Sequence, residues 1–250
     1  MNRTITCPSG LSGEVRGIAA KNIEVLADRR LQKSGLLVDK MLAACWLGMT
    51  DPGPYQFDDG NVDWQKVLAG DRFYAVMQCR IATYGPKYAF QAQCEDRRCR
   101  HPFTWEVDLE NDLAVKTFEQ ADIEAFLAGN RLEEALPDGR KFWFRLATGS
   151  EEVKIAKYGE QASAFIPAVV ARLHAIEGVK DGGMRSFLEN EDMSVAFDIL
   201  HAMDKHDGGI DTAFMTDCPK CGAVKERNIP FDQGFLIPRA SSPRTATAAP

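Results

Sequence analysis

The stretches CEDRRC (residues 94–99) and CPKCG (residues 218–222) hold four of the seven cysteines of this chain, and more than a hundred residues separate them. KYAFQAQ before the first stretch and PFTWEVDL after it alternate in polarity and are rich in aromatic residues, which is typical of a β-hairpin. IDTAFMTD and AVKERNIPF flank the second stretch in the same way. We therefore predict two hairpins, over residues 87–109 and 210–231. Their tips carry Cys94, Cys99, Cys218 and Cys221.

Two cysteine pairs on hairpin turns are the usual ligands of a structural zinc site, in which four thiolates form a tetrahedron around the metal. The spacing of Cys218 and Cys221 fits this pattern closely, and the four residues between Cys94 and Cys99 are at its long end. His101 is an alternative ligand, although a partly exposed histidine is expected there. Four thiols without metal, or a reversible disulfide within each pair, are the other interpretations. Because four thiolates leave no position for water, we predict a structural zinc-ribbon-like unit split by a long insertion.

Composition and charge limit the class of protein. The chain has 250 residues, of which 45% are hydrophobic and 26% are charged, as in ordinary globular proteins. The longest apolar run, residues 41–49, is shorter than the roughly 20 residues that cross a bilayer, and the first residues lack the apolar segment of a signal peptide. We therefore expect a cytoplasmic protein with reduced thiols and no membrane contact. The net charge of −6 disfavours nucleic acid and favours protein partners.

The remaining sequence predicts an α+β fold that is mostly helical with small β-hairpins. Apolar residues recur at helical spacing in several segments. The predicted helical segments are residues 22–35, 36–48, 62–85, 118–129, 148–158, 163–178 and 191–206. Thr148 and Glu151 have the spacing of a capping box, and a third hairpin is expected over residues 131–147.

The ends of the chain have a different composition. Residues 1–20 mix β-forming residues with glycines and predict an extended N-terminal arm with a short strand or hairpin, followed by a single mixed domain over residues 21–237. Residues 238–250 hold no large apolar side chain and predict a disordered tail. In the arm, we predict that Leu11, Val15 and Ile18 contact a partner by adding a strand to its sheet. The alternative is an ordinary strand packed on its own domain.

No catalytic motif is evident, so we predict that the protein is not an enzyme. Walker, G-x-G-x-x-G, H-E-x-x-H and G-x-S-x-G patterns do not occur in the sequence. His174 and His201 fall in helical patterns, where a satisfied or solvated side chain is expected. A polar helix end before a glycine turn explains Asp204, His206 and Asp207 without a metal.

Several phrases of the sequence resemble the baseplate protein family of T-even-like contractile-tailed phages. They are CPSGLSGEVRGI (7–18), LADRR (26–30), DPGPY (51–55), DWQKVLAGDRFYAVMQCRIATYGPKYAF (63–90) and CPKCGAVKERNIPFDQGF (218–235). The resemblance spans about residues 5–236 and also points to prophage and injection-system relatives. It implies a structural baseplate or hub component, or a hub-assembly accessory, with other tail proteins as partners and an oligomeric state in the particle.

The resemblance further implies assembly in the host cytoplasm and a final place in the virion tail, and it supplies no active-site residues. An alternative function is a zinc-ribbon adaptor that binds nucleic acid or regulates transcription. That hypothesis depends on CPKCG and on the basic residues Arg97, Arg98 and Arg100 beside the first cysteine pair.

Overall fold

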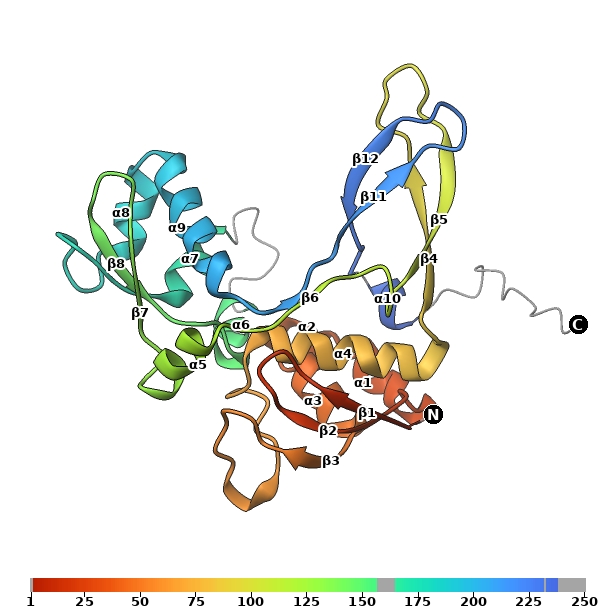
Figure 1. Ribbon diagram of the computed structural model, residues 1–250, viewed down its shortest axis with the longest axis horizontal. Helices are drawn as coiled ribbons and strands as arrows, with labels where there is room; N and C mark the ends of the chain where they lie inside the picture. Colours follow the sequence, from red (N-terminus) through yellow and green to blue (C-terminus); the bar gives the residue numbers. More distant parts are fainter. Residues whose placement is uncertain (1, 157–164, 232, 238–250) are drawn as a thin grey trace, which may run out of the picture.

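The fold is mixed α+β with small antiparallel sheets, as predicted. The structure is a computed structural model and describes residues 2–156, 165–231 and 233–237; the predicted tail over residues 238–250 lies outside them. A long central helix, α4 (Ala69–Tyr84), has an N-terminal sheet and helices on one side, and two separate projections rise on the other side (Figure 1). No helix among the described residues is long and apolar enough to cross a bilayer.

The N-terminal part is a three-stranded sheet packed with short helices against α4. The strands are β1 (Asn2–Thr6), β2 (Ser12–Arg16) and β3 (Trp46–Asp51), in the order β1-β2-β3. The helices are α1 (Ile23–Ala27), α2 (Arg29–Ser34) and α3 (Leu37–Cys45). The predicted helix over residues 22–35 is broken at Asp28, whose carboxylate accepts the backbone N–H of Arg30 at 2.7 Å.

The prediction of an extended N-terminal arm is corrected by this sheet. Residues 2–16 form a hairpin, and β2 lies between β1 and β3. Leu11 and Val15 are 0% exposed in the main core, and Ile18 packs against that core. The side chains of Leu11 and Val15 are therefore buried by the protein's own sheet and helices and do not lie on the surface of the folded domain, whereas Ile18 is only partly buried. The alternative, a strand packed on its own domain, is what the structure has.

A second part of the chain extends the main core. It contains α5 (Gln120–Leu127), β7 (Leu132–Ala135), β8 (Lys141–Phe144), α6 (Gly149–Ala156), α7 (Phe165–Arg172), β9 (Leu173–Ile176), α8 (Met184–Asn190) and α9 (Met193–His206). The predicted hairpin over residues 131–147 is β7–β8, and β9 completes the sheet β7-β8-β9. The main core draws on both this part and the N-terminal part.

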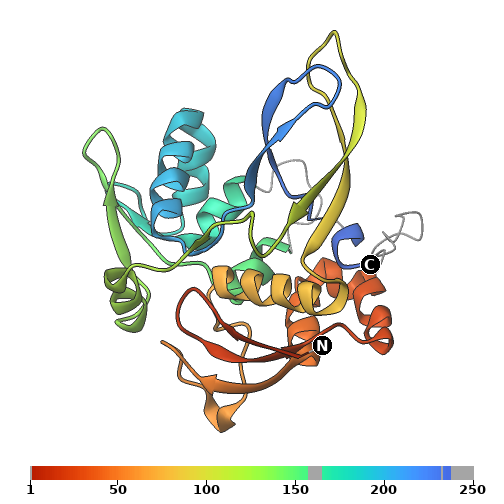
Figure 2. The ribbon, with the colours of Figure 1, turned by 45° about the vertical axis from the view of Figure 1, so that its right-hand side comes forward.

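The remaining projection is a pair of β-hairpins, confirmed over the predicted ranges. The hairpin pair consists of β4 (Lys87–Gln93), β5 (Pro102–Asp108), β11 (Ala213–Asp217) and β12 (Val224–Asn228). Connecting strands β6 (Val115–Lys116) and β10 (Gly209–Ile210) pair beside its base, and α10 (Gln233–Leu236) follows it. An apolar cluster joins the base to α4, and its buried members include Met77, Ile81, Tyr88, Val107 and Phe235. Figure 2 shows the hairpin pair rising away from α4 in a second view.

Candidate metal centre

The hairpin pair brings the four predicted cysteines together at its tip. Cys94 and Cys99 come from the β4–β5 turn, and Cys218 and Cys221 come from the β11–β12 turn. Their four Sγ atoms all lie within 4.8 Å of one another, close enough to bind one metal ion. The Cys94–Cys221 and Cys99–Cys218 Sγ distances are 3.7 and 3.8 Å, far longer than a disulfide bond of about 2.05 Å. The prediction that residues 94–99 and 218–222 meet in space is confirmed.

The two turns share a backbone feature. It explains how cysteine pairs with different spacings, Cys94/Cys99 and Cys218/Cys221, both direct their sulfurs to one centre. The residue directly after the second cysteine has a positive φ in both turns, 44° at Arg100 and 69° at Gly222. The N–H of Cys94 donates to the carbonyl of His101 at 2.9 Å and closes the longer turn. A left-handed residue at this position turns the chain back into the second strand, so both sulfurs of each pair face the centre.

Hydrogen bonds lower the pKa of one thiol of the group. Burial raises the pKa of Cys218, but the backbone N–H groups of Cys221 and Lys220, together with the thiols of Cys221 and Cys94, outweigh burial, so the pKa falls to about 7. Cys218 is therefore suited to ionise near neutral pH, as a metal ligand requires. For Cys94, burial is the largest effect and the pKa is raised.

Contacts that the sequence did not predict hold the two hairpins beside the cysteines. Glu95, on the first hairpin, pairs with Lys225 at 3.2 Å and with Arg227 at 3.4 Å, both on β12. Arg227 also donates to the backbone carbonyl of Gln93 at 2.6 Å. Phe103 is buried between Cys94 and Cys218 in the small apolar cluster of the tip. No local pattern links Glu95 to strand β12, because the pairing depends on the hairpins meeting.

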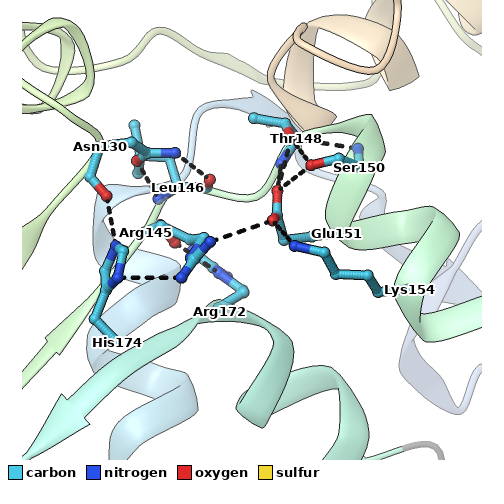
Figure 3. A network of polar contacts seen from close by, with 9 residues as sticks. All are labelled: Asn130, Arg145, Leu146, Thr148, Ser150, Glu151, Lys154, Arg172 and His174. Atoms are coloured by element: carbon cyan, nitrogen blue, oxygen red, sulfur yellow. Dashed lines mark hydrogen bonds and ion pairs between the residues drawn. The ribbon is translucent and has the colours of Figure 1, made fainter.

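A second polar cluster, shown in Figure 3, was not predicted as a unit and is structural. His174 uses both ring nitrogens, one 3.1 Å from Arg145 Nη2 and the other 3.0 Å from the carbonyl of Asn130. Glu151 accepts the backbone N–H of Thr148 at 3.1 Å, which is one of the two hydrogen bonds of the predicted capping box, and it lies 3.7 Å from Arg145. These contacts fasten α6 and β9 to the segment after β8.

The polar residues His206 and Asp207, at the end of α9, do not form a shared site, because they contact different partners. Arg172 donates to both carboxylate oxygens of Asp207, at 2.8 and 2.7 Å. His206 contacts Asp122 and Glu134 from opposite ring nitrogens, so these side chains do not converge on a single position.

Comparisons with protein-family models, with curated proteins and with solved structures found no match to this chain. The functional proposals therefore depend on the four-cysteine centre, the surfaces of the hairpin pair and the sequence phrases quoted above.

Proposed function

We propose that the protein is a structural or assembly component of a contractile phage tail baseplate, or of a related injection apparatus, acting through protein contacts. We further propose that a zinc ion bound by Cys94, Cys99, Cys218 and Cys221 clamps its hairpin pair. The observation that carries the clamp is the convergence of four sulfurs from two hairpins that lie far apart in the sequence. The tail role is supported by the sequence resemblance.

The sulfur geometry supports zinc. A tetrahedral zinc site with Zn–S bonds of about 2.3 Å requires sulfur atoms about 3.8 Å apart. The Cys94–Cys221 and Cys99–Cys218 separations between the hairpins, 3.7 and 3.8 Å, agree with that requirement. Four thiolates are a soft donor set that selects zinc or iron over magnesium and calcium. Because they close the coordination shell, the metal would stabilise the fold instead of activating water.

Metal content tests the clamp directly. Native mass spectrometry of the purified protein should show about one zinc per chain, as a four-ligand structural site requires. The Cys218→Ser/Cys221→Ser variant should lose the metal and melt at a lower temperature. Lys220→Ser, between the two cysteines but without a ligand atom, should keep both the metal and the melting temperature. Iron in place of zinc, or no metal together with an unchanged melt in the cysteine variant, would contradict the proposal.

The positions of the resembling sequence phrases in the fold support the proposed tail role. Residues 7–18 build the β1–β2 turn and β2, residues 63–90 build α4 and most of β4, and residues 218–235 build β12 and the turn before it. The phrases thus run through the main core, the central helix and the hairpin pair. A pattern spread over the framework, with no catalytic motif in it, favours a protein that acts through its shape and contacts.

A genetic experiment tests the tail role in the phage or prophage that encodes the chain. Inactivating the gene should abolish particles with complete baseplates in electron micrographs, and a plasmid copy should restore them. A Glu226→Gln copy, changed at an exposed position of β12 outside the cysteine turn, should restore them as well, whereas the Cys218→Ser/Cys221→Ser copy should not. Antibody labelling of purified tails separates a permanent subunit from an assembly factor. Complete, contractile tails without the gene would refute the role, and salt-dependent DNA or RNA binding would favour the adaptor hypothesis instead.

A further inference from the structure

The tip of the hairpin pair presents exposed cations that the rest of the structure does not neutralise. The tip cations are Arg97, Arg98, Arg100 and Lys220, all in the two cysteine turns. Within the described residues none of them forms an ion pair, whereas the nearby Glu95 is occupied by Lys225 and Arg227. Figures 1 and 2 place these turns at the end of the hairpin pair, away from α4. Val224, beside the same turn, is 61% exposed and adds apolar surface.

The other projection carries a surface of opposite charge. On α9, Met193 and Phe197 are 69% and 52% exposed, although both are apolar. They lie one helical turn apart with the exposed carboxylates of Asp192 and Asp198 beside them, and we call these four residues the α9 patch. Residues 186–204 contain no lysine or arginine. An exposed apolar pair with a polar, charged rim is typical of a protein interface.

We propose that the tip cations of one copy dock on the α9 patch of a second copy, head to tail. The charges are complementary, and Val224 would face the apolar pair of the patch. The two surfaces lie on different projections (Figure 1), so each docking event leaves one free tip and one free patch. Such a heterologous contact builds a ring if its rotation closes and a filament if it does not. This inference goes beyond the baseplate proposal and does not depend on it.

Charge distribution favours a second copy over nucleic acid as the occupant. The cations are confined to two short turns, where Asp96 and Asp217 lie among them, and the whole chain carries a net charge of −6. A nucleic-acid backbone would require a longer positive track to compensate for repulsion by the rest of the protein. The α9 patch, in contrast, offers a few carboxylates over a small area, which arginine side chains can bind in a bidentate way.

Two charge-reversal variants test the contact by sedimentation velocity on the metal-loaded protein. Wild type should associate with rising concentration, and less so at high salt. The tip variant, Arg97→Glu/Arg98→Glu, and the patch variant, Asp192→Lys/Asp198→Lys, should each associate about tenfold more weakly or worse. An equimolar mixture of the two should associate again, although neither variant does so alone. In that mixture the arginine tip of the patch variant meets the acidic patch of the tip variant, and the glutamate tip of the tip variant meets the lysine patch of the patch variant.

Arg29→Glu/Arg30→Glu is the matched control, because it makes the same change in net charge at exposed positions of α2 and should associate like wild type. Recovered association in the mixture also shows that both variants are folded. The proposal would be overturned if wild type stays monomeric or if the mixture stays monomeric. It would also be overturned if the control variant associates as weakly as the tip variant. A monomeric wild type that retards DNA through the tip arginines would overturn it in favour of phosphate binding.

Discussion

His206, at the C-terminal end of α9, lies between two carboxylates from other elements. Its Nδ1 is 2.6 Å from Asp122 and its Nε2 is 3.0 Å from Glu134. A neutral imidazole has one N–H and can donate to only one of them, whereas the imidazolium donates to both. Burial lowers the pKa of His206, but its contacts with Asp122 and Glu134 outweigh burial, so the pKa is raised above its ordinary value of 6.5.

This contact predicts a pH dependence of stability. Because the folded-state pKa is raised, the contribution is complete below pH 6.5 and is lost as the pH rises through the higher folded value. We expect the free energy of unfolding to fall by about 1–3 kcal/mol over that range. Urea denaturation at a series of pH values measures it. His206→Gln should flatten this part of the profile, and His201→Gln, exposed on the same helix, should leave it intact. An unchanged profile in His206→Gln would show that the contact does not contribute.

At the residue scale, what the sequence predicts depends on whether the signal is local. Cys218 and Cys221 carry a spacing with a known chemical use, and the aromatic alternation around both pairs marks the hairpins. Leu11 and Val15 have a pattern that fits an exposed strand or a buried one equally well, since alternation does not say which sheet covers it. The role of Arg100 in closing its turn has no sequence signal, because arginine rarely adopts a positive φ.

At the scale of elements, the hairpin pair has little apolar surface of its own at the tip. The buried apolar residues there are Cys94, Phe103 and Cys218 among those described, whereas the base is attached to α4 by the larger cluster around Met77. The proposed metal therefore provides much of the contact between the two tips. Without it, the tips should separate before the rest of the protein unfolds.

Hydrogen exchange measures this separation. After removal of the metal by a chelator, we expect amide protection to fall in the two cysteine turns and the adjoining ends of β4, β5, β11 and β12, and to persist at the base of the hairpin pair and in α4. Lys220→Ser should respond to the chelator as wild type does. The Cys218→Ser/Cys221→Ser variant should show the reduced protection without any chelator. Equal protection before and after chelation, or loss of protection throughout the chain, would contradict an element that is clamped locally.

Two strands show where element prediction from sequence fails. β3 follows α3 without a break at Trp46, and β9 follows α7 without a break at Leu173. In both places an apolar run continues the helical pattern, so the sequence predicts a longer helix. The strands exist because they pair with β2 and β8 respectively. Such long-range pairing leaves no local mark, whereas a hairpin carries its turn and both strands in one stretch.

At the scale of the whole molecule, the positions of the two projections depend on the route that the chain takes past α4. The chain leaves the hairpin pair through β6, builds the α5–α9 part and returns through β10, which pairs with β6 and contacts α4. The sequence predicts a single domain, and the shared main core is consistent with that. It does not predict this passage, because the passage depends on contacts of β10 with β6 and α4, both of which lie far from β10 in the sequence.

Gly70 allows the returning segment at Gly208 to lie against α4, and replacing Gly70 tests this contact. A Cβ atom at Gly70 would lie 2.0 Å from the carbonyl oxygen of Gly208, closer than atoms can approach, and the obstacle is backbone. Gly70→Ala must therefore push the returning segment away from α4, and we expect a loss of about 1–3 kcal/mol or more in the free energy of unfolding. Gly48→Ala, on β3 with open space around it, should cost little. Equal melting temperatures for wild type and Gly70→Ala would mean that this backbone contact does not hold the returning segment against α4.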